Sequence, residues 1–199
     1  MKLQKEFYTR EDTLTIAREL LGKYVYTHFD GILTGGIIVE TEAYMGPHDA
    51  GSHAFNGRRT SRNETMYAEG GLTYMYICYG IHDMLNIVTG SAGSSHAILI
   101  RAIEPTDGIE TMQFRRGNVP LKRLATGPGA LAKALGLRKH HDAYDLNSTE
   151  IWIEDKELII PEKKIKATGR VGLGCKDPYL TIPWRFIIEG NPFVSKGPK

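Results

Sequence analysis

The sequence is poor in cysteine and contains no long hydrophobic run. Its 199 residues include two cysteines, Cys78 and Cys175, which can form at most one disulfide. This excludes a disulfide scaffold and is typical of an intracellular protein. No segment approaches the roughly 20 consecutive apolar residues of a membrane-spanning helix. The first eight residues carry both charges and no apolar stretch, so we expect neither a secretory signal nor a membrane anchor.

The sequence also lacks an excess of charge. There are 25 Lys+Arg against 23 Asp+Glu, and the apolar and charged fractions of 41% and 24% are those of soluble globular proteins. These values exclude the collagen-like, coiled-coil and disordered classes. Basic residues nevertheless cluster after residue 57, beginning with Arg58, Arg59 and Arg62. Such clusters suit a face that meets a polyanion, although on composition alone an ordinary solvated surface is the simpler interpretation.

Short apolar strands outnumber helices and do not alternate with them. We predict helices at 12–21, 106–116 and 128–137, and strands at 24–28, 32–42, 72–79, 84–88, 97–103, 151–153, 158–160 and 184–188. Asp30-Gly31 indicates a hairpin turn, and residues 47–63 indicate a long ordered loop, which at this length is usually functional. The pattern predicts one α+β domain over residues 1–199, with a curved, mostly antiparallel sheet and surrounding helices.

Two carboxylates and an aromatic ring share one face of a predicted strand. Successive side chains of a strand point to opposite sides, so Glu40, Glu42 and Tyr44 lie together. At the end of an apolar strand this pattern suggests a polar pocket beneath an aromatic wall. A half-solvated edge strand would produce the same alternation.

A second aromatic segment ends in a glycine. Tyr74, Tyr76 and Cys78 point one way from the predicted strand, and Tyr79 stands before Gly80, where a turn would expose it. An exposed aromatic residue at a tip can act as a wedge or a stacking group, whereas a core strand closed by a tyrosine is the alternative. With no histidine partner in sequence, Cys78 is interpreted as a buried structural thiol.

Two further patterns each allow a functional and a structural interpretation. His48, Asp49 and His53 could hold a metal ion, but their spacing is not that of the helical zinc motifs. Gly127-Pro128-Gly129 opens a predicted helix and offers free backbone amides to a phosphate. An ordinary helix start explains the same three residues.

Together these segments resemble the alkyladenine (3-methyladenine) DNA glycosylase family. The most specific matches are Glu-Thr-Glu-Ala-Tyr at 40–44, Tyr-x-x-Tyr-Gly at 76–80 and Arg-Ala-x-Glu-Pro at 101–105. The resemblance covers nearly the whole chain, through residues 17–22, 39–47, 53, 58–63, 66, 71–77, 79–80, 86, 99–105, 127–128, 170–172 and 185–192. It implies a monofunctional repair enzyme that hydrolyses the N-glycosidic bond of alkylated or deaminated purines: 3-methyladenine, 7-methylguanine and hypoxanthine.

The resemblance also implies roles for individual residues. Glu42 would be the general base that activates a water molecule, which Arg101 and the backbone carbonyl of Val171 would help to hold. The flipped base would lie among Tyr44, His53 and Tyr76, with Asn86 at the purine's edge. DNA contacts would come from Tyr79, which fills the gap left by the flipped nucleotide, and from Arg58, Arg62, Met66 and His82. His82 departs from the aromatic residue expected at its position, and residues 138–168 match weakly and receive no role.

The implied partner is double-stranded DNA containing damaged purines. We expect no metal or other cofactor, no membrane association, no obligate protein partner and a monomer. Two alternatives remain at this point: a metal-dependent hydrolase using His48, Asp49 and His53, and a nucleic-acid-binding protein without catalysis.

Overall fold

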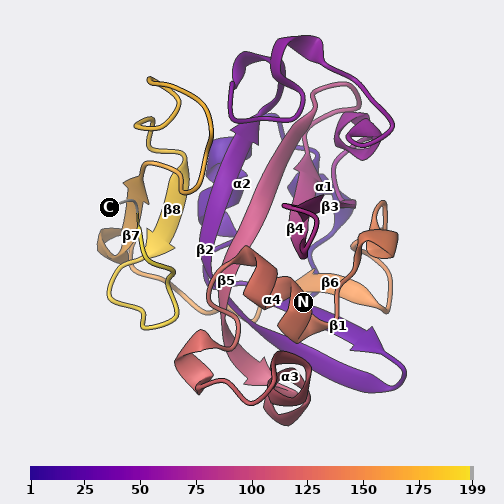
Figure 1. The fold of residues 1–199 in the computed structure, drawn as a ribbon, viewed down its shortest axis with the longest axis vertical. Coiled ribbons are helices and arrows are strands. Elements are labelled where there is room, and N and C mark those ends of the chain that lie inside the picture. The colour runs from indigo at the N-terminus through magenta and orange to yellow at the C-terminus, as the bar shows by residue number, and fades with distance from the viewer. Residues whose placement is uncertain (198–199) are drawn as a thin grey trace.

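A single curled antiparallel sheet dominates the fold. The computed structural model describes residues 1–197, whose eight strands include six in the order β3-β4-β5-β2-β1-β6, while β8 pairs with β2 and β7 pairs with β8 (Figure 1). The strands are β1 Tyr24–Phe29, β2 Ile32–Met45, β3 Thr73–Cys78, β4 His82–Thr89, β5 His96–Asp107, β6 Ile151–Glu154, β7 Ile165–Thr168 and β8 Arg185–Ile188. Helices pack around this sheet, which confirms the predicted α+β class with a curved, antiparallel sheet.

The long strand β2 organises the sheet. Residues 32–37 pair with β1, and residues 40–42 pair with β8 on the same edge, while β5 runs along the other edge. The β1–β2 hairpin turns at Asp30 and Gly31, whose φ angles of 53° and 76° fit the predicted two-residue turn. Because two strands share one edge of β2, residues far apart in sequence meet beside its middle.

The pairing of β2 with β5 has three register shifts, and two of them are bulges beside Glu40. Ile38 pairs with Ile103 and Glu40 with Ala102, so Val39 has no partner on β5. Thr41 then pairs with Ile100, which leaves Arg101 as the extra residue on β5. A bulge bends a strand and redirects side chains. The two bulges therefore curl the sheet and redirect Arg101 at the position where Glu40 and Glu42 lie.

The helices cover the sheet through apolar faces. In α2, Thr13–Glu19, Ile16 and Ala17 are buried, and Asp12 caps the first turn by accepting the Thr15 N–H at 3.0 Å. The other helices are α1 Lys5–Tyr8, α3 Ile109–Arg116 and α4 Pro128–Leu135, and α4 packs on β4 and α3. None of the helices within residues 1–197 is long and apolar enough to cross a membrane.

Four details differ from the sequence-based prediction. Residues 158–160 are not a strand; Leu158 and Ile159 are exposed, and the next strand, β7, begins only at Ile165. The strand predicted at 97–103 continues to Asp107, because Pro105 lies at a register shift opposite Gly36, where a missing N–H is tolerated. The helix predicted from residue 106 starts at Ile109, since β5 continues to Asp107. The short helix α1 was not predicted.

The buried His141 contributes to a dependence of the stability of this fold on pH. The His141 ring stacks on Phe29 at 4.4 Å, and its Nδ1 accepts the Arg138 N–H at 2.9 Å. Burial, with a contribution from His140, lowers the pKa of His141 to about 4. Between pH 6.5 and 4 the unfolded chain therefore binds a proton at His141 that the folded chain does not bind, so the free energy of unfolding falls as the pH falls.

We predict that His141→Asn, which keeps an acceptor for Arg138, flattens this dependence. Urea unfolding at pH 7 and pH 5 is expected to show a loss of stability about 1–2 kcal/mol smaller in the variant than in the wild type. His28→Asn, at an exposed position of β1, serves as the control and should lose as much as the wild type. An unchanged difference in the His141 variant would contradict the prediction.

Candidate active site

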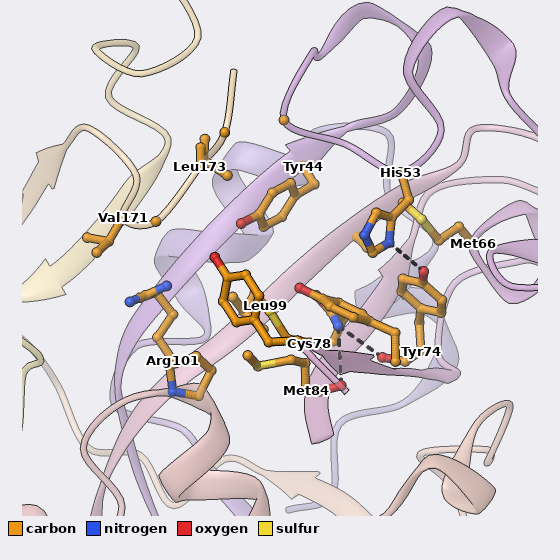
Figure 2. A pocket seen from close by; sticks show the side chains of 18 of the residues that line it. Tyr44, His53, Met66, Tyr74, Cys78, Met84, Leu99, Arg101, Val171 and Leu173 are labelled. Atoms are coloured by element: carbon orange, nitrogen blue, oxygen red, sulfur yellow. Dashed lines mark hydrogen bonds between the residues drawn. The ribbon is translucent and has the colours of Figure 1, made fainter. Parts of the chain in front are cut away.

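A pocket of about 480 Å³ opens beside the end of β2. Its lining comes from distant segments: Tyr44 on β2, His53 in the following loop, Tyr76 on β3, Asn86 on β4 and Arg101 on β5 (Figure 2). Residues 171–174 close the side next to Arg101. Further lining residues are Gly51, Arg62, Met66, Tyr74, Cys78, Tyr79, Met84, Ala97, Leu99 and Pro128. The structure thus brings nine of the twelve predicted site residues to one cavity wall.

The pocket has neutral aromatic walls. The rings of His53 and Tyr76 meet edge to face at 4.6 Å, and His53 Nδ1 shares a hydrogen bond of 2.7 Å with the Tyr74 hydroxyl. Burial, with contributions from Arg62 and Arg58, lowers the pKa of His53 to about 4, so the ring is uncharged at neutral pH. Burial raises the pKa of Tyr76 to about 12, so its hydroxyl keeps its proton. Such walls offer π faces and hydrogen-bonding groups without a net charge.

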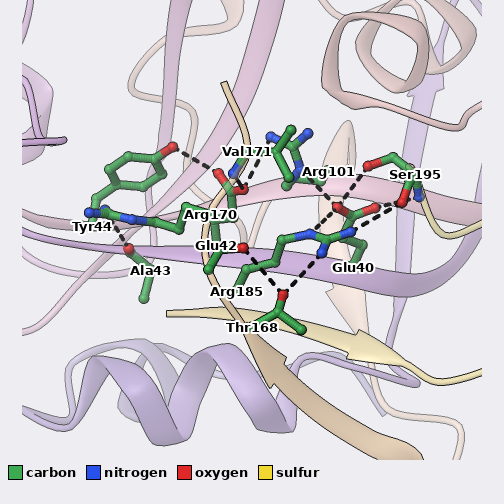
Figure 3. A network of polar contacts seen from close by, with 11 residues as sticks. Glu40, Glu42, Ala43, Tyr44, Arg101, Thr168, Arg170, Val171, Arg185 and Ser195 are labelled. Atoms are coloured by element: carbon green, nitrogen blue, oxygen red, sulfur yellow. Dashed lines mark hydrogen bonds and ion pairs between the residues drawn. The ribbon is translucent and has the colours of Figure 1, made fainter. Parts of the chain in front are cut away.

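Glu42 lies directly behind this wall and is fully buried (Figure 3). Its Oε2 accepts a hydrogen bond from the Tyr44 hydroxyl at 2.9 Å, and its Oε1 accepts the Val171 N–H at 2.7 Å. Arg101 Nη1 lies 3.3 Å from Oε1. Burial raises the pKa of Glu42 above the usual value, while Arg101, the Val171 N–H and the Tyr44 hydroxyl oppose that rise. A carboxylate in this setting is a stronger base than an exposed one.

Glu40, which precedes Glu42 by two residues on the same face of β2, belongs to the same hydrogen-bond network. Its Oε1 accepts hydrogen bonds from Arg101 Nε at 2.9 Å and Arg185 Nε at 2.7 Å. Ser195 donates its N–H to Oε2 at 2.7 Å and its hydroxyl to Oε1 at 2.8 Å. Arg101 therefore bridges both carboxylates, and Glu42 and Glu40 raise its pKa overall although burial acts in the opposite direction. The predicted shared face of Glu40, Glu42 and Tyr44 is confirmed.

A buried ion pair lies behind Tyr44. Arg170 donates from its two Nη atoms to Asp49 at 2.6 and 2.7 Å, and both side chains are inaccessible to solvent. Its guanidinium lies 4.7 Å from the Tyr44 ring and 5.1 Å from the Trp184 ring. Sequence reasoning missed Arg170, although it directly precedes Val171 in a matched segment, and considered Asp49 only as a metal ligand.

The metal interpretation finds no supporting cluster. Asp49 is engaged by Arg170, and His53 Nδ1 by Tyr74. Within residues 1–197 no group of three or more His, Cys, Asp or Glu side chains is arranged to hold a metal ion.

Tyr79 is exposed at the tip of the β3–β4 hairpin, as predicted. Its side chain is 85% exposed beside the pocket, and its φ of 51° and that of Gly80 at 73° make the tight turn. The next residue, Ile81, is 73% exposed and was not singled out from the sequence. A turn that holds two large apolar side chains in water is suited to contact with another molecule.

The other predicted residues divide between the pocket and its surroundings. Arg62 and Met66 line the pocket, and the Arg62 guanidinium lies 5.8 Å from the Tyr76 ring. Arg58 is exposed outside the lining. His82 also lies outside it and covers Gly129 at the start of α4, where a Cβ would approach the His82 ring to within 2.9 Å.

Two predictions need adjustment in detail. Cys78 is not a buried structural thiol: it is half-buried in the pocket wall, because the hairpin ends just after it. Asn86 lines the pocket and also bonds to the backbone, donating from Nδ2 to the carbonyls of Tyr74 at 3.0 Å and Met84 at 3.4 Å (Figure 2). These bonds fix the orientation of the Asn86 amide.

Comparison with known proteins gives one consistent result. The family model described as methylpurine-DNA glycosylase (MPG) matches residues 6–192. A Chlamydia felis protein named "Putative 3-methyladenine DNA glycosylase" is 43% identical over 189 residues, covering 94% of this chain and 96% of the relative. Proteins of the same name from Clostridium perfringens and Bacillus thuringiensis are each 40% identical over 205 residues, covering 98% of this chain and 100% of the relative.

Proposed function

The chain belongs to the methylpurine-DNA glycosylase family, and we propose that it releases 3-methyladenine, 7-methylguanine and hypoxanthine from duplex DNA in base-excision repair. The family identifies a monofunctional DNA glycosylase, which is a hydrolase of N-glycosidic bonds. The observation that carries the proposal is Glu42, a buried carboxylate held by Tyr44, Val171 and Arg101 against an aromatic pocket. This arrangement supplies a base and a purine-sized space side by side.

The pocket chemistry suits a purine that has left the helix. A base cannot be excised within the stack, so it must be flipped at a cost of a few kcal/mol. Tyr44, His53 and Tyr76 present π faces, which attract purines made cationic by alkylation at N3 or N7. Because His53 is neutral near pH 7, it does not repel such a cation.

Hydrolysis then follows from the position of Glu42. Water attacks C1′ of the sugar as the bond from C1′ to the purine nitrogen breaks, and Glu42 accepts the proton of the water. Positive charge develops on the sugar, and the same carboxylate stabilises it. General-base catalysis contributes about 10²–10⁴ in rate, and the raised pKa of Glu42 strengthens the base. Arg101 and the Val171 backbone carbonyl would help to hold the water.

The exposed residues beside the pocket would contact the DNA. Tyr79 would enter the minor groove and fill the gap left by the flipped nucleotide. Arg62 and Met66 at the pocket, with Arg58 and His82 outside it, would contact the strand around the lesion. We propose that the protein binds damaged DNA as a monomer, without a protein partner.

Glu42→Gln is predicted to abolish base release while lesion binding stays nearly intact, because the amide keeps the shape but cannot accept a proton. The assay incubates duplex DNA carrying one of the three lesions with protein in EDTA and measures free base, with exposed Glu150→Gln as the control. Release should fall at least about 10²-fold in the Glu42 variant only. A variant rate within about tenfold of wild type would show that Glu42 is not the base.

In the wild type, base release should decline as the pH falls through the pKa of Glu42, which burial raises above the value of an ordinary glutamate.

Tyr79→Ala is predicted to weaken both lesion affinity and excision in duplex DNA, because the flipped state loses the group that fills the gap. Excision from single-stranded DNA should suffer less, since little stacking must be broken. Phe114→Ala removes an equally exposed ring, also 85% exposed, outside the pocket lining and should change neither. Equal losses of the Tyr79 variant on both substrates would assign that residue a merely structural role.

Asn86→Ser is predicted to raise release of undamaged guanine relative to hypoxanthine. These bases differ by the 2-amino group of guanine, and the Asn86 amide, fixed by two backbone carbonyls, cannot rotate away from it. The comparison uses mispaired guanine, where flipping is cheap and the fit in the pocket limits the rate. An unchanged ratio in a variant whose thermal unfolding is cooperative would refute this role of Asn86 and leave the glycosylase assignment intact.

A further inference from the structure

The ring of Tyr44 has the pocket on one side and a charged group behind it. Tyr44 lines the cavity, whereas Arg170 does not, and the Arg170 guanidinium lies 4.7 Å from the centre of the ring (Figure 3). Trp184 lies 5.1 Å from the same guanidinium. The buried Arg170 Nε has no hydrogen-bond partner among the described residues, as expected of a group that faces ring surfaces.

Arg170 also has a structural role, because it links two parts of the backbone. Its Nη1 donates to the Ala43 carbonyl at 3.1 Å, and its Nη2 donates to the Tyr179 carbonyl at 3.3 Å. These bonds tie the end of β2 to the segment that carries Val171. A positive charge at this place nevertheless disfavours the binding of a cationic purine that stacks on Tyr44. A positive charge behind a ring opposes a second positive charge in front of it, and a buried charge is little screened by salt.

Asp49 compensates the positive charge of Arg170. It receives two hydrogen bonds from Arg170 and is as fully buried as its partner. The pair is neutral as a unit, so the front face of Tyr44 keeps its attraction for cations. We propose that Asp49 is a specificity determinant: by cancelling the charge of Arg170 behind Tyr44, it allows this wall to accept cationic purines as readily as neutral ones. The proposal rests on the proposed function.

The test compares a cationic and a neutral lesion in the same duplex. Single-turnover release of 7-methylguanine and of hypoxanthine is measured for each variant, and the ratio of the two rates is compared with the wild-type ratio. Asp49→Asn leaves the Arg170 charge uncompensated and is expected to lower the cation-to-neutral ratio by about thirtyfold, the factor given by a unit charge about 8 Å away at an effective dielectric constant of about 20. Arg170→Gln leaves Asp49 unopposed and is expected to raise the ratio at pH 8.

Two further variants separate charge from structure. The double variant Asp49→Asn with Arg170→Gln has no charge behind Tyr44 and should return to within about threefold of the wild-type ratio, whatever its overall rate. Asp49→Glu keeps the charge and should also keep the ratio. If Asp49→Asn does not fold in a thermal unfolding assay, the opposite shift in Arg170→Gln carries the test.

The outcomes are distinguishable. Losses that are equal for both bases in the single variants, or shifts of the same sign in both, would reduce the pair to a structural crosslink and overturn the proposal. A wild-type protein that releases neither base would instead refute the proposed function.

Discussion

The site depends on a single arginine shared between two buried carboxylates. Glu40 and Glu42 lie on one face of β2 with no exposure to water, where two like charges destabilise the fold unless they are compensated. Arg101 reaches both from β5, because a bulge leaves it unpaired at the position between them. Arg185 on β8 adds a second cation to Glu40. The cations that compensate these two carboxylates thus come from the two strands that flank this part of β2, and one of them, Arg101, lines the pocket.

The buried charges around the pocket compensate one another, whereas the exposed Arg62 of the lining forms no ion pair with a described residue. Arg101 is matched by the two glutamates and Arg170 by Asp49, while His53 stays neutral through burial. The pocket therefore offers aromatic surface and hydrogen-bonding groups in front of compensated buried charges. The same ion pairs connect the segments that surround the pocket: β2 with β5, and the loop after β2 with the segment that carries Val171.

Local patterns in the sequence predicted the parts of this site that depend on neighbouring residues. Alternation placed Glu40, Glu42 and Tyr44 on one face, and the Tyr79-Gly80 pair placed an exposed ring at a turn. The bulge that redirects Arg101 has no local signal, and neither has the bond between Asp49 and Arg170, which are 121 positions apart. The apolar run at 158–160 predicted a strand because periodicity does not show whether a neighbouring strand is available to pair with it.

The contact of Ser195 with Glu40 spans 155 positions and sets the order in which the site comes into being. A ribosome delivers the N-terminal part of a chain first, at about 5–20 residues per second, so β2 emerges roughly 8–30 s before Ser195 does. During that interval Glu40 lacks three of its four hydrogen-bond donors, and Glu42 lacks the Val171 N–H. The nascent chain therefore carries its carboxylates without the groups that orient them. The pocket therefore cannot reach its final arrangement before residues 170–195 have been translated.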